Sequence, residues 1–264
     1  MPPTILFNEL TRTELRRRAP DTLLVLPTAA TEQHGPYLPV GTDCFEVEAV
    51  ARTAAEKASS RISVLVAPTL PFGSSHHHLP WGATLSLSSD AYYQAVFDLV
   101  RTIVVEGGFR RVFLLNGHGG NDVLNQLVAR DIAVQFAANV AAGSHWAIAW
   151  DALVEAGAPK RGHVPGHAGD FEASLVLAIR PELVSPERPK DDRVWNQNPR
   201  SFYPNYHVER HGFFQSFDGH TDSSHNASAE VGQRYLGLIT DAVADAFVQF
   251  YQQPLLPGPG SPRT

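Results

Sequence analysis

Short, continuous apolar runs alternate along this chain with longer segments of helical pattern, and this alternation constrains the fold more than any other feature. A strand with one face in water alternates apolar and polar residues, whereas these runs are apolar throughout, as in strands covered on both faces. The pattern therefore predicts an α/β protein with a three-layer α/β/α architecture and a mostly parallel central sheet. The expected strands are residues 22–27, 62–68, 111–116 and 146–150, and the expected helices are residues 43–58, 89–106, 121–140, 168–179 and 228–251.

The chain of 264 residues fits a single domain, expected at residues 1–253, before a Pro- and Gly-rich tail at 254–264 that we expect to be disordered. The net charge of −6 argues against nucleic acid or an anionic membrane as a partner. No run approaches the roughly 20 apolar residues that span a bilayer. One cysteine and no visible secretory signal predict a cytoplasmic protein. Because only 18% of the residues are charged, we expect a homo-oligomer with surface buried between subunits.

A first group of metal-type side chains follows the first expected strand. Glu32 and His34 are two residues apart, so in an extended segment both point the same way, and Asp43 opens the next helix. Ligands bind at this edge of doubly wound sheets, and these donors suit Zn, Mn or Fe. Asp43 and Glu46 also have the spacing of a capping box. The alternative is that Asp43 only caps the helix and that Glu32 is solvated.

A second cluster, Asn-Gly-His-Gly-Gly-Asn at residues 116–121, follows the third expected strand. Glycines on both sides of His118 let the backbone bring the imidazole close to a ligand. The dinucleotide-binding fingerprint fails because Asp122 stands where its third glycine belongs, and no P-loop sequence occurs. A turn with a structural histidine is the remaining alternative to a ligand-binding role for His118.

A third cluster, HAGDFE at residues 167–172, begins a helix that is apolar nearly all round and is therefore expected to be buried. A carboxylate in such a helix is costly unless it is paired or bound to a metal. Glu172 therefore needs a positive partner, which is either a metal ion or an arginine. Three clusters of metal-type donors at one edge of one sheet favour a common metal site.

Two long irregular segments, at residues 70–85 and 185–225, interrupt the alternation. Long loops in compact domains are commonly functional, and the aromatic residues of the second favour an ordered loop. Adjacent histidines at 76–78 rarely all face one ion, so we expect this stretch to form a pocket wall or lid. The expected substrate-binding residues are His78, Trp81, Gly119 and Gly120.

Taken together, these segments resemble the creatininase family of creatinine amidohydrolases. The matching stretches are TEQHGPYLPVGTD at residues 31–43, NGHGGN at 116–121 and HAGDFEASLVLAIRPELV at 167–184, and their order and spacing also match. The resemblance implies a metal-dependent hydrolase of α/β/α fold, commonly a hexamer. It implies two divalent metal ions per subunit, for which we expect zinc, with manganese or iron as alternatives.

By position, the resemblance also implies a role for each donor. Glu32 and His118 would bind one metal and His34 the other, while Asp43 would bridge the two. His167 would stand beside the site as an acid/base group.

The chain departs from the creatininases proper directly after His118. Those enzymes carry a metal-binding glutamate two residues after this histidine and a tyrosine between, where this chain has Gly120 and Gly119. The departure leaves a place at the second metal that Glu172 could fill. It also groups the chain with NGHGGN-type relatives, which resemble formamide hydrolases of flavin and deazaflavin precursor synthesis and the peptidase-like protein of mycofactocin maturation.

The predicted activity is hydrolysis of a C–N bond in a small amide, lactam or formamide through a metal-bridging hydroxide. We expect His167 and Glu172 to be the catalytic residues and a small-molecule amide to be the substrate. A peptidase-like maturation enzyme with the same metals is the first alternative. The second is a non-catalytic protein that binds a metal or a small molecule on this fold.

Overall fold

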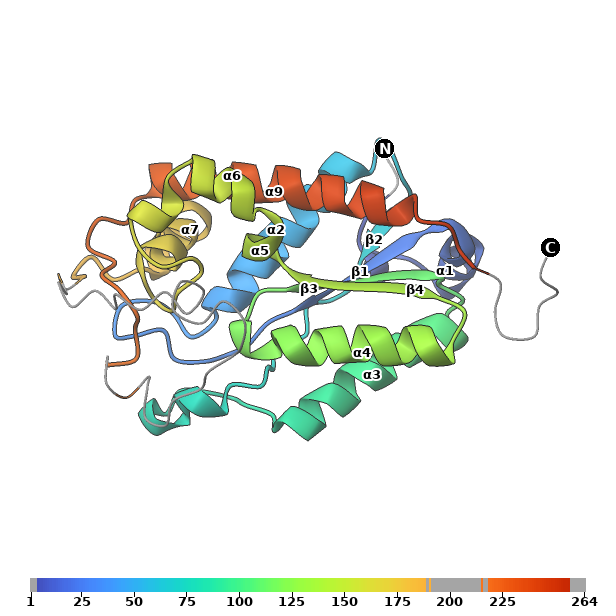
Figure 1. Ribbon diagram of the computed structural model, residues 1–264, viewed down its shortest axis with the longest axis horizontal. Helices are drawn as coiled ribbons and strands as arrows, with labels where there is room; N and C mark the ends of the chain where they lie inside the picture. The colour runs from blue at the N-terminus through green and yellow to red at the C-terminus, as the bar shows by residue number, and fades with distance from the viewer. Residues whose placement is uncertain (1–3, 189, 191–214, 216–217, 257–264) are drawn as a thin grey trace.

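The computed structural model describes residues 4–188, 190, 215 and 218–256, and its centre is a parallel sheet (Figure 1). Four strands pair in the order β2–β1–β3–β4, all parallel. Helices cover both faces of this sheet, which confirms the predicted three-layer α/β/α architecture. The strands are β1 (Leu23–Thr28), β2 (Val64–Val66), β3 (Arg111–Asn116) and β4 (Asn139–Ser144).

The two helical layers differ in size, and the larger one lies above the sheet in Figure 1. It contains α2 (Thr42–Ala58), α5 (His145–Ile148), α6 (Trp150–Glu155), α7 (Asp170–Ile179) and α9 (Ala229–Tyr251). The layer below contains α3 (Ser89–Val105) and α4 (Asp122–Gln135), and the short α1 (Arg12–Arg18) lies near the sheet's amino-terminal edge. The described residues also contain short 3-10 turns at Phe7–Glu9, Ala19–Asp21, His76–Trp81, Gly119–Asn121, Ala158–Lys160 and Pro181–Leu183.

Strand β1 shows why a continuous apolar run marks a central strand. All six of its residues are buried, and it pairs with β2 on one side and β3 on the other. Successive side chains point to opposite faces of a sheet. Val25 therefore packs against the larger helical layer, whereas Leu24 and Leu26 pack against the smaller one.

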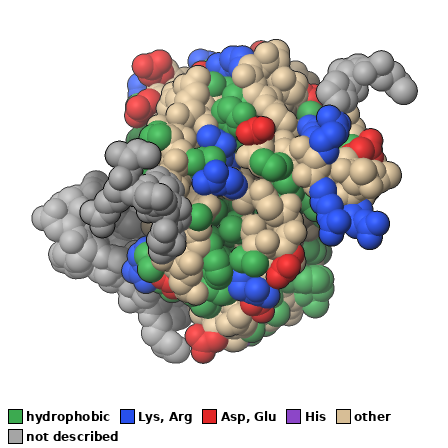
Figure 2. Space-filling model, turned by 90° about the vertical axis from the view of Figure 1, so that its right-hand side faces the viewer, with side chains coloured by type: hydrophobic (Ala, Val, Ile, Leu, Met, Phe, Trp, Pro, Cys, Tyr) green, Lys and Arg blue, Asp and Glu red, His purple; other side chains and the backbone are tan. Residues whose placement is uncertain are grey.

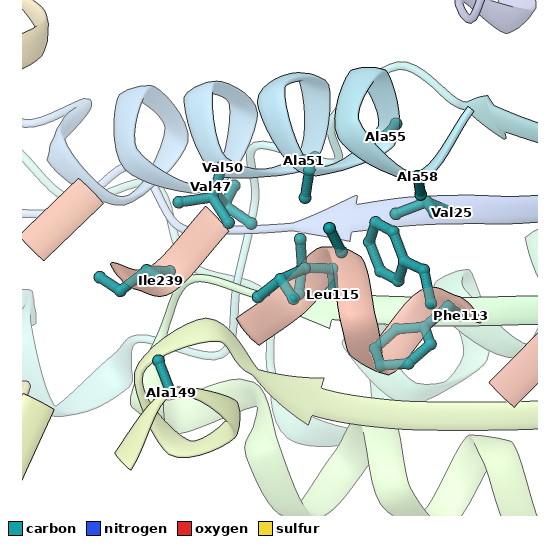
Figure 3. Packing of buried hydrophobic residues seen from close by; sticks show 14 of the residues in the cluster. Val25, Val47, Val50, Ala51, Ala55, Ala58, Phe113, Leu115, Ala149 and Ile239 are labelled. Atoms are coloured by element: carbon teal, nitrogen blue, oxygen red, sulfur yellow. The ribbon is translucent and has the colours of Figure 1, made fainter. Parts of the chain in front are cut away.

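Small side chains let α2 lie close to the sheet. Ala51, Ala55 and Ala58 are fully buried on its inner face, where they pack with Val25 and Phe113 (Figure 3). The same cluster continues into α9, which packs beside α2 and also contacts the sheet, with the Phe247 ring 5.1 Å from that of Phe113 in β3. This packing fixes the position of the first turn of α2, from which Asp43 projects.

The strand order creates a crevice at the carboxyl ends of β1 and β3. From β1 the chain crosses through α2 to β2, while from β3 it crosses through α4 to β4 on the opposite side. Neighbouring strands whose connections diverge in this way leave a gap beyond their carboxyl ends, where ligands of doubly wound sheets bind. Thr28 and Asn116 form the last pair of residues in register before the gap.

The sequence prediction of the fourth strand is wrong. Residues 146–150 fall in α5, α6 and the single residue between them, and the strand lies earlier, at Asn139–Ser144, where its first two residues overlap the end of the helix expected at 121–140. The physical reason is that β4 is an edge strand of small, half-buried residues with little strand propensity, and only its pairing with β3 makes it a strand.

Two predictions fall largely outside the described residues. These are the ordered loop at 185–225, of which 189, 191–214 and 216–217 are not described, and the disordered tail at 254–264, of which 257–264 are not described. Among the described helices, none has both the length and the apolar character needed to cross a bilayer.

The end of the molecule away from α7 carries mixed charge (Figure 2). Lys and Arg side chains lie there beside Asp and Glu side chains, among hydrophobic ones. Exposed ion pairs also join α2 and the turn after it to α9, with Lys57 Nζ 2.7 Å from Asp241 Oδ1 and an Arg61 nitrogen 2.8 Å from Asp245 Oδ1. Pairs of this exposure contribute little to stability, so the docking of α9 depends on its apolar face.

We predict that Gly232→Ala destabilises the protein by about 1–3 kcal/mol, because the new methyl group would overlap the Ser174 carbonyl where α9 crosses α7. Gly237, on the same helix, has open space around its Cβ position, so Gly237→Ala should stabilise by up to about 1 kcal/mol. Urea unfolding of both variants tests this packing. Equal stability of the two variants would contradict it.

Candidate metal centre

All three donor clusters meet in the crevice at the carboxyl edge of the sheet. The first lies in the segment between β1 and α2 and in the first turn of α2, the second directly follows β3, and the third precedes and opens α7. Their side chains are buried despite their polarity, with relative exposures of 0% for Glu32, 0% for His34, 1% for Asp43, 5% for His118, 6% for His167 and 6% for Glu172.

Asp43 lies between two histidines and does not cap its helix. Helix α2 begins at Thr42, and its N-cap residue, Gly41, makes no side-chain capping bond, so the capping-box interpretation is wrong. Asp43 Oδ1 is 3.1 Å from His34 Nε2, and Oδ2 is 3.2 Å from His118 Nδ1. The two oxygens of one carboxylate thus face two different imidazoles.

Glu32 turns toward the same centre. Its Oε1 is 3.2 Å from His118 Nδ1, 3.4 Å from His78 Nε2 and 3.7 Å from His167 Nδ1. Because Glu32 is fully buried, the alternative that it is solvated is wrong.

Glu172 reaches the centre from the first turn of α7. Its Oε2 accepts a hydrogen bond from the backbone N–H of Ala168 at 2.5 Å and lies 3.8 Å from His34 Nε2. No ion pair with an arginine is found for Glu172 within the described part of the chain. Arg161 pairs with Asp170 instead, at 2.9 Å.

Backbone carbonyls orient three of the histidines. His34 Nδ1 is 3.1 Å from the Glu32 carbonyl, His118 Nε2 is 3.3 Å from the Ser74 carbonyl, and His167 Nε2 is 2.8 Å from the Gln33 carbonyl. A carbonyl oxygen only accepts, so each of these nitrogens carries a hydrogen. When the ring is neutral, the opposite nitrogen, which faces the carboxylates, presents a lone pair, as in metal-ligating histidines.

The electrostatics favour positive charge among the carboxylates. Although burial opposes it, Asp43, Glu172 and Glu32 raise the pKa of His34 to about 10, and Glu32 and Asp43 raise the pKa of His118 well above its usual value. Burial raises the pKa of Glu172 to about 8. The protons that this centre attracts are those that a metal cation would replace.

Buried atoms without partners supply the test of fit for a metal. Among the described residues, both carboxylate oxygens of Glu32, Nε2 of His34 and Oδ2 of Asp43 lack a well-aligned hydrogen bond. Buried polar atoms of native proteins are nearly always bonded, and these nitrogen and oxygen donors suit Zn, Mn or Fe. Three groups have ligand atoms within 4.8 Å of one another: Glu32–His34–His167, Glu32–His77–His118 and His34–Asp43–Glu172.

The predicted substrate-binding residues have different surroundings. His78 is 1% exposed and lies inside the centre, and Trp81 is half-buried with its ring centroid 6.2 Å from that of His78. Gly119 faces open space, whereas a Cβ on Gly120 would overlap the Ser74 carbonyl and His118 Nε2. No side chain fits at position 120 without displacement, which agrees with the glycine there.

Sequence reasoning missed His77 and Gln33. His77 could join Glu32 and His118 around an ion, but its place in a run of three histidines concealed which ring turns inward. Gln33 is 6% exposed and contacts His78 and His167. Gln33 lies between Glu32 and His34 in the sequence, and this position is the signal that could have identified it. Side chains of an extended segment alternate in direction, however, and strict alternation would direct Gln33 away from the centre.

The fold and the donors define a class: an α/β/α protein with a buried histidine–carboxylate centre at the switch point of its sheet. The family model described as "Creatinine amidohydrolase" matches residues 8–247. The chain therefore belongs to the creatininase family, as its motifs predict.

Proteins with assigned activities also match the chain. It is 30% identical over 264 residues to a creatinine amidohydrolase of Pseudomonas putida, covering 93% of this chain and 97% of that protein. It is 31% identical over 170 residues to a mycofactocin precursor peptide peptidase of Mycobacterium ulcerans (strain Agy99), covering 62% of this chain and 61% of the peptidase. The second match thus spans less than two thirds of the relative.

Solved structures of creatininase share the fold over nearly the whole chain. A crystal structure of creatinine amidohydrolase matches with a TM-score of 0.74 and 28% identity, covering 95% of this chain and 99% of that one. A manganese form of creatininase matches with a TM-score of 0.74 and 29% identity. A Zn–Zn form of a creatininase variant also matches, with a TM-score of 0.74 and 28% identity.

We predict that Gly120→Ala weakens zinc binding by about 10–100-fold, because its methyl group would displace the His118 ring or the Ser74 carbonyl that orients it. Gly119→Ala is the matched control, since nothing lies within 4 Å of its Cβ position. Competition titrations with a zinc chelator compare the two. Equal affinities would show that the ring has room to move.

Proposed function

We propose that this chain is a metal-dependent amidohydrolase that cleaves a C–N bond in a small amide, lactam or formamide. The observation that carries the proposal is the placement of Asp43, whose two oxygens face His34 and His118 in an otherwise unsatisfied buried centre. Membership of the creatininase family also supports an amidohydrolase function.

Two sets of residues would hold two divalent ions. Glu32 and His118 would bind one, His34 and Glu172 the other, and Asp43 would bridge them. Zinc is the proposed metal, with manganese or iron as alternatives, and the zinc and manganese forms of similar creatininases support this choice. When bound, such ions act as Lewis acids on a carbonyl and lower the pKa of water to roughly 7.

His167 is the proposed acid/base residue. Burial and the charge of His34 lower its pKa well below the usual value, so the ring is neutral and accepts at Nδ1. Its Nε2 hydrogen is held by the Gln33 carbonyl, which keeps Nδ1 turned toward Glu32. His167 would accept the proton of the attacking water at Nδ1 and return it to the leaving nitrogen. Glu172, the other predicted catalytic residue, would act through the ion that it holds.

The glycines at 119 and 120 shape the substrate space. The space beside Gly119 is open, whereas Gly120 lets the chain pass close to Ser74 and His118. His78 and Trp81 would contact the substrate from the 3-10 turn His76–Trp81. A peptide substrate is the second candidate, favoured by the similarity to the mycofactocin precursor peptidases. A cytoplasmic location, a homo-oligomer such as a hexamer and a single domain over residues 1–253 remain part of the proposal.

The proposal is tested by metal analysis of protein purified without chelator, followed by hydrolysis assays. The assay panel contains small amides, lactams, formamides and a short peptide. Two equivalents of metal and release of amine or acid from a non-peptide substrate are expected. Cleavage of the peptide alone would favour the maturation enzyme, and metal without any turnover would favour a binding protein.

We predict that Asp43→Ala loses both metal ions and all activity, because one carboxylate contributes to both sites. Glu46→Gln is the control: Glu46 is a buried carboxyl one turn further along α2 whose pKa burial raises well above its usual value. An amide replaces a protonated carboxyl with little change, so this variant should keep its metals. Mass spectrometry measures the metal content of both variants. Two metals retained in Asp43→Ala would contradict the bridging role of Asp43.

We predict that His167→Ala keeps both metals and lowers kcat by about 10²–10⁴, because proton transfer by a side chain is worth that much in rate. The measurement is kcat on the substrate identified by the panel, with metal content determined on the same sample. A near-normal kcat would remove the acid/base role from His167, and loss of metal would make His167 a ligand.

A further inference from the structure

The side-chain amide of Gln33 lies buried among four segments of the chain, and no role in metal binding accounts for it. Its Oε1 accepts a hydrogen bond from the Gly35 backbone N–H at 2.9 Å. Its Nε2 lies 2.9 Å from His78 Nδ1, 3.0 Å from His167 Nε2 and 3.0 Å from the Gly219 carbonyl. The amide thus connects the segment after β1 with both histidines and with the chain that precedes α9.

The hydrogens of this network can be assigned by elimination. Gly35 N–H is a donor, so the oxygen of the amide faces it and the NH₂ group faces the histidines. His167 Nε2 is 2.8 Å from the Gln33 carbonyl, which only accepts, so this nitrogen carries a hydrogen and cannot accept one from the amide. The two amide hydrogens therefore go to the Gly219 carbonyl and to His78 Nδ1.

This assignment sets His78 apart from the other histidines of the centre. Because its Nδ1 accepts from Gln33, a neutral His78 carries its hydrogen on Nε2, which lies 3.4 Å from Glu32 Oε1. A nitrogen that bears a hydrogen cannot ligate a metal. His78 therefore presents a donor to the centre, whereas His167 presents a lone pair.

We propose that Gln33 is a positioning residue that fixes His78 as the tautomer with its hydrogen on Nε2 and holds that ring stacked on His167. The two rings lie 4.0 Å apart between centroids and are inclined by 17°, so one residue holds a donor and an acceptor side by side. The role of Gln33 in catalysis rests on the proposed amidohydrolase function, whereas the tautomer of His78 does not depend on that function.

The first experiment is nuclear magnetic resonance of the zinc-loaded full chain labelled with ¹⁵N at histidine. The signals of His78 are assigned by their loss in H78Q. We expect a protonated Nε2 and an unprotonated Nδ1 for His78. A hydrogen on Nδ1 of His78 in the unmodified protein would overturn the proposal.

The second experiment uses Q33E, which keeps the acceptor for Gly35 but has no hydrogen to give to His78 Nδ1. We expect the His78 ring to gain a hydrogen at Nδ1, the zinc content to stay unchanged and kcat to fall by about 10–100-fold with little change in KM. If Q33E does not fold, Q33M is used in its place, because it also removes the donor to His78 and adds no charge. Unchanged His78 signals in both variants would refute the proposal.

Asn125 provides a matched control, because it is another buried amide with two hydrogen bonds. It is 1% exposed, its Nδ2 donates to Thr28 Oγ1 at 2.9 Å, and its Oδ1 accepts from Tyr92 at 2.8 Å. N125D should lower stability and leave the His78 signals in place; an equal shift of those signals would reduce Gln33 to a structural role. The spectra need no substrate, so failure to hydrolyse every amide would count against the proposed function alone.

Discussion

The burial of negative charge at one edge of the sheet is the constraint on which the rest of this structure depends. Glu32, Asp43 and Glu172 are almost completely removed from water. Carboxylates in such a place are strongly destabilising unless positive charge or hydrogen-bond donors surround them. The surrounding imidazoles meet this need in part, and the raised pKa of His34 shows how strongly the carboxylates favour a cation beside them.

Close packing of the backbone brings these groups together. Gly117 lies against Val47 of α2, where a Cβ would be only 2.7 Å from the Val47 Cβ, so β3 can end directly beside the first turns of that helix. Gly120 in turn lies under the Ser74 carbonyl, which orients His118. The absence of side chains at these two positions is thus what lets three distant segments share one small volume.

Much of the site could be predicted from the sequence because its donors occur in short motifs that follow strands. Their position directly after apolar strands places Glu32, His34 and His118 at the carboxyl edge of a parallel sheet. The contribution of the 3-10 turn at His76–Trp81 could not be predicted, because three adjacent histidines look alike in sequence. Which of them turns inward depends on the packing of this turn against the segments after β1 and β3, and on the contact of Gln33 with His78.

By itself, the sequence determined the layer architecture, the parallel sheet and the types of donor, because apolar periodicity and residue chemistry are local properties. The tertiary structure decided which segment became the fourth strand, that Asp43 faces two histidines and does not cap its helix, and which nitrogen of each histidine faces the carboxylates. These outcomes depend on contacts between residues far apart in the chain. Strand pairing made a strand of the weakly apolar Asn139–Ser144, and backbone carbonyls of other segments oriented the rings.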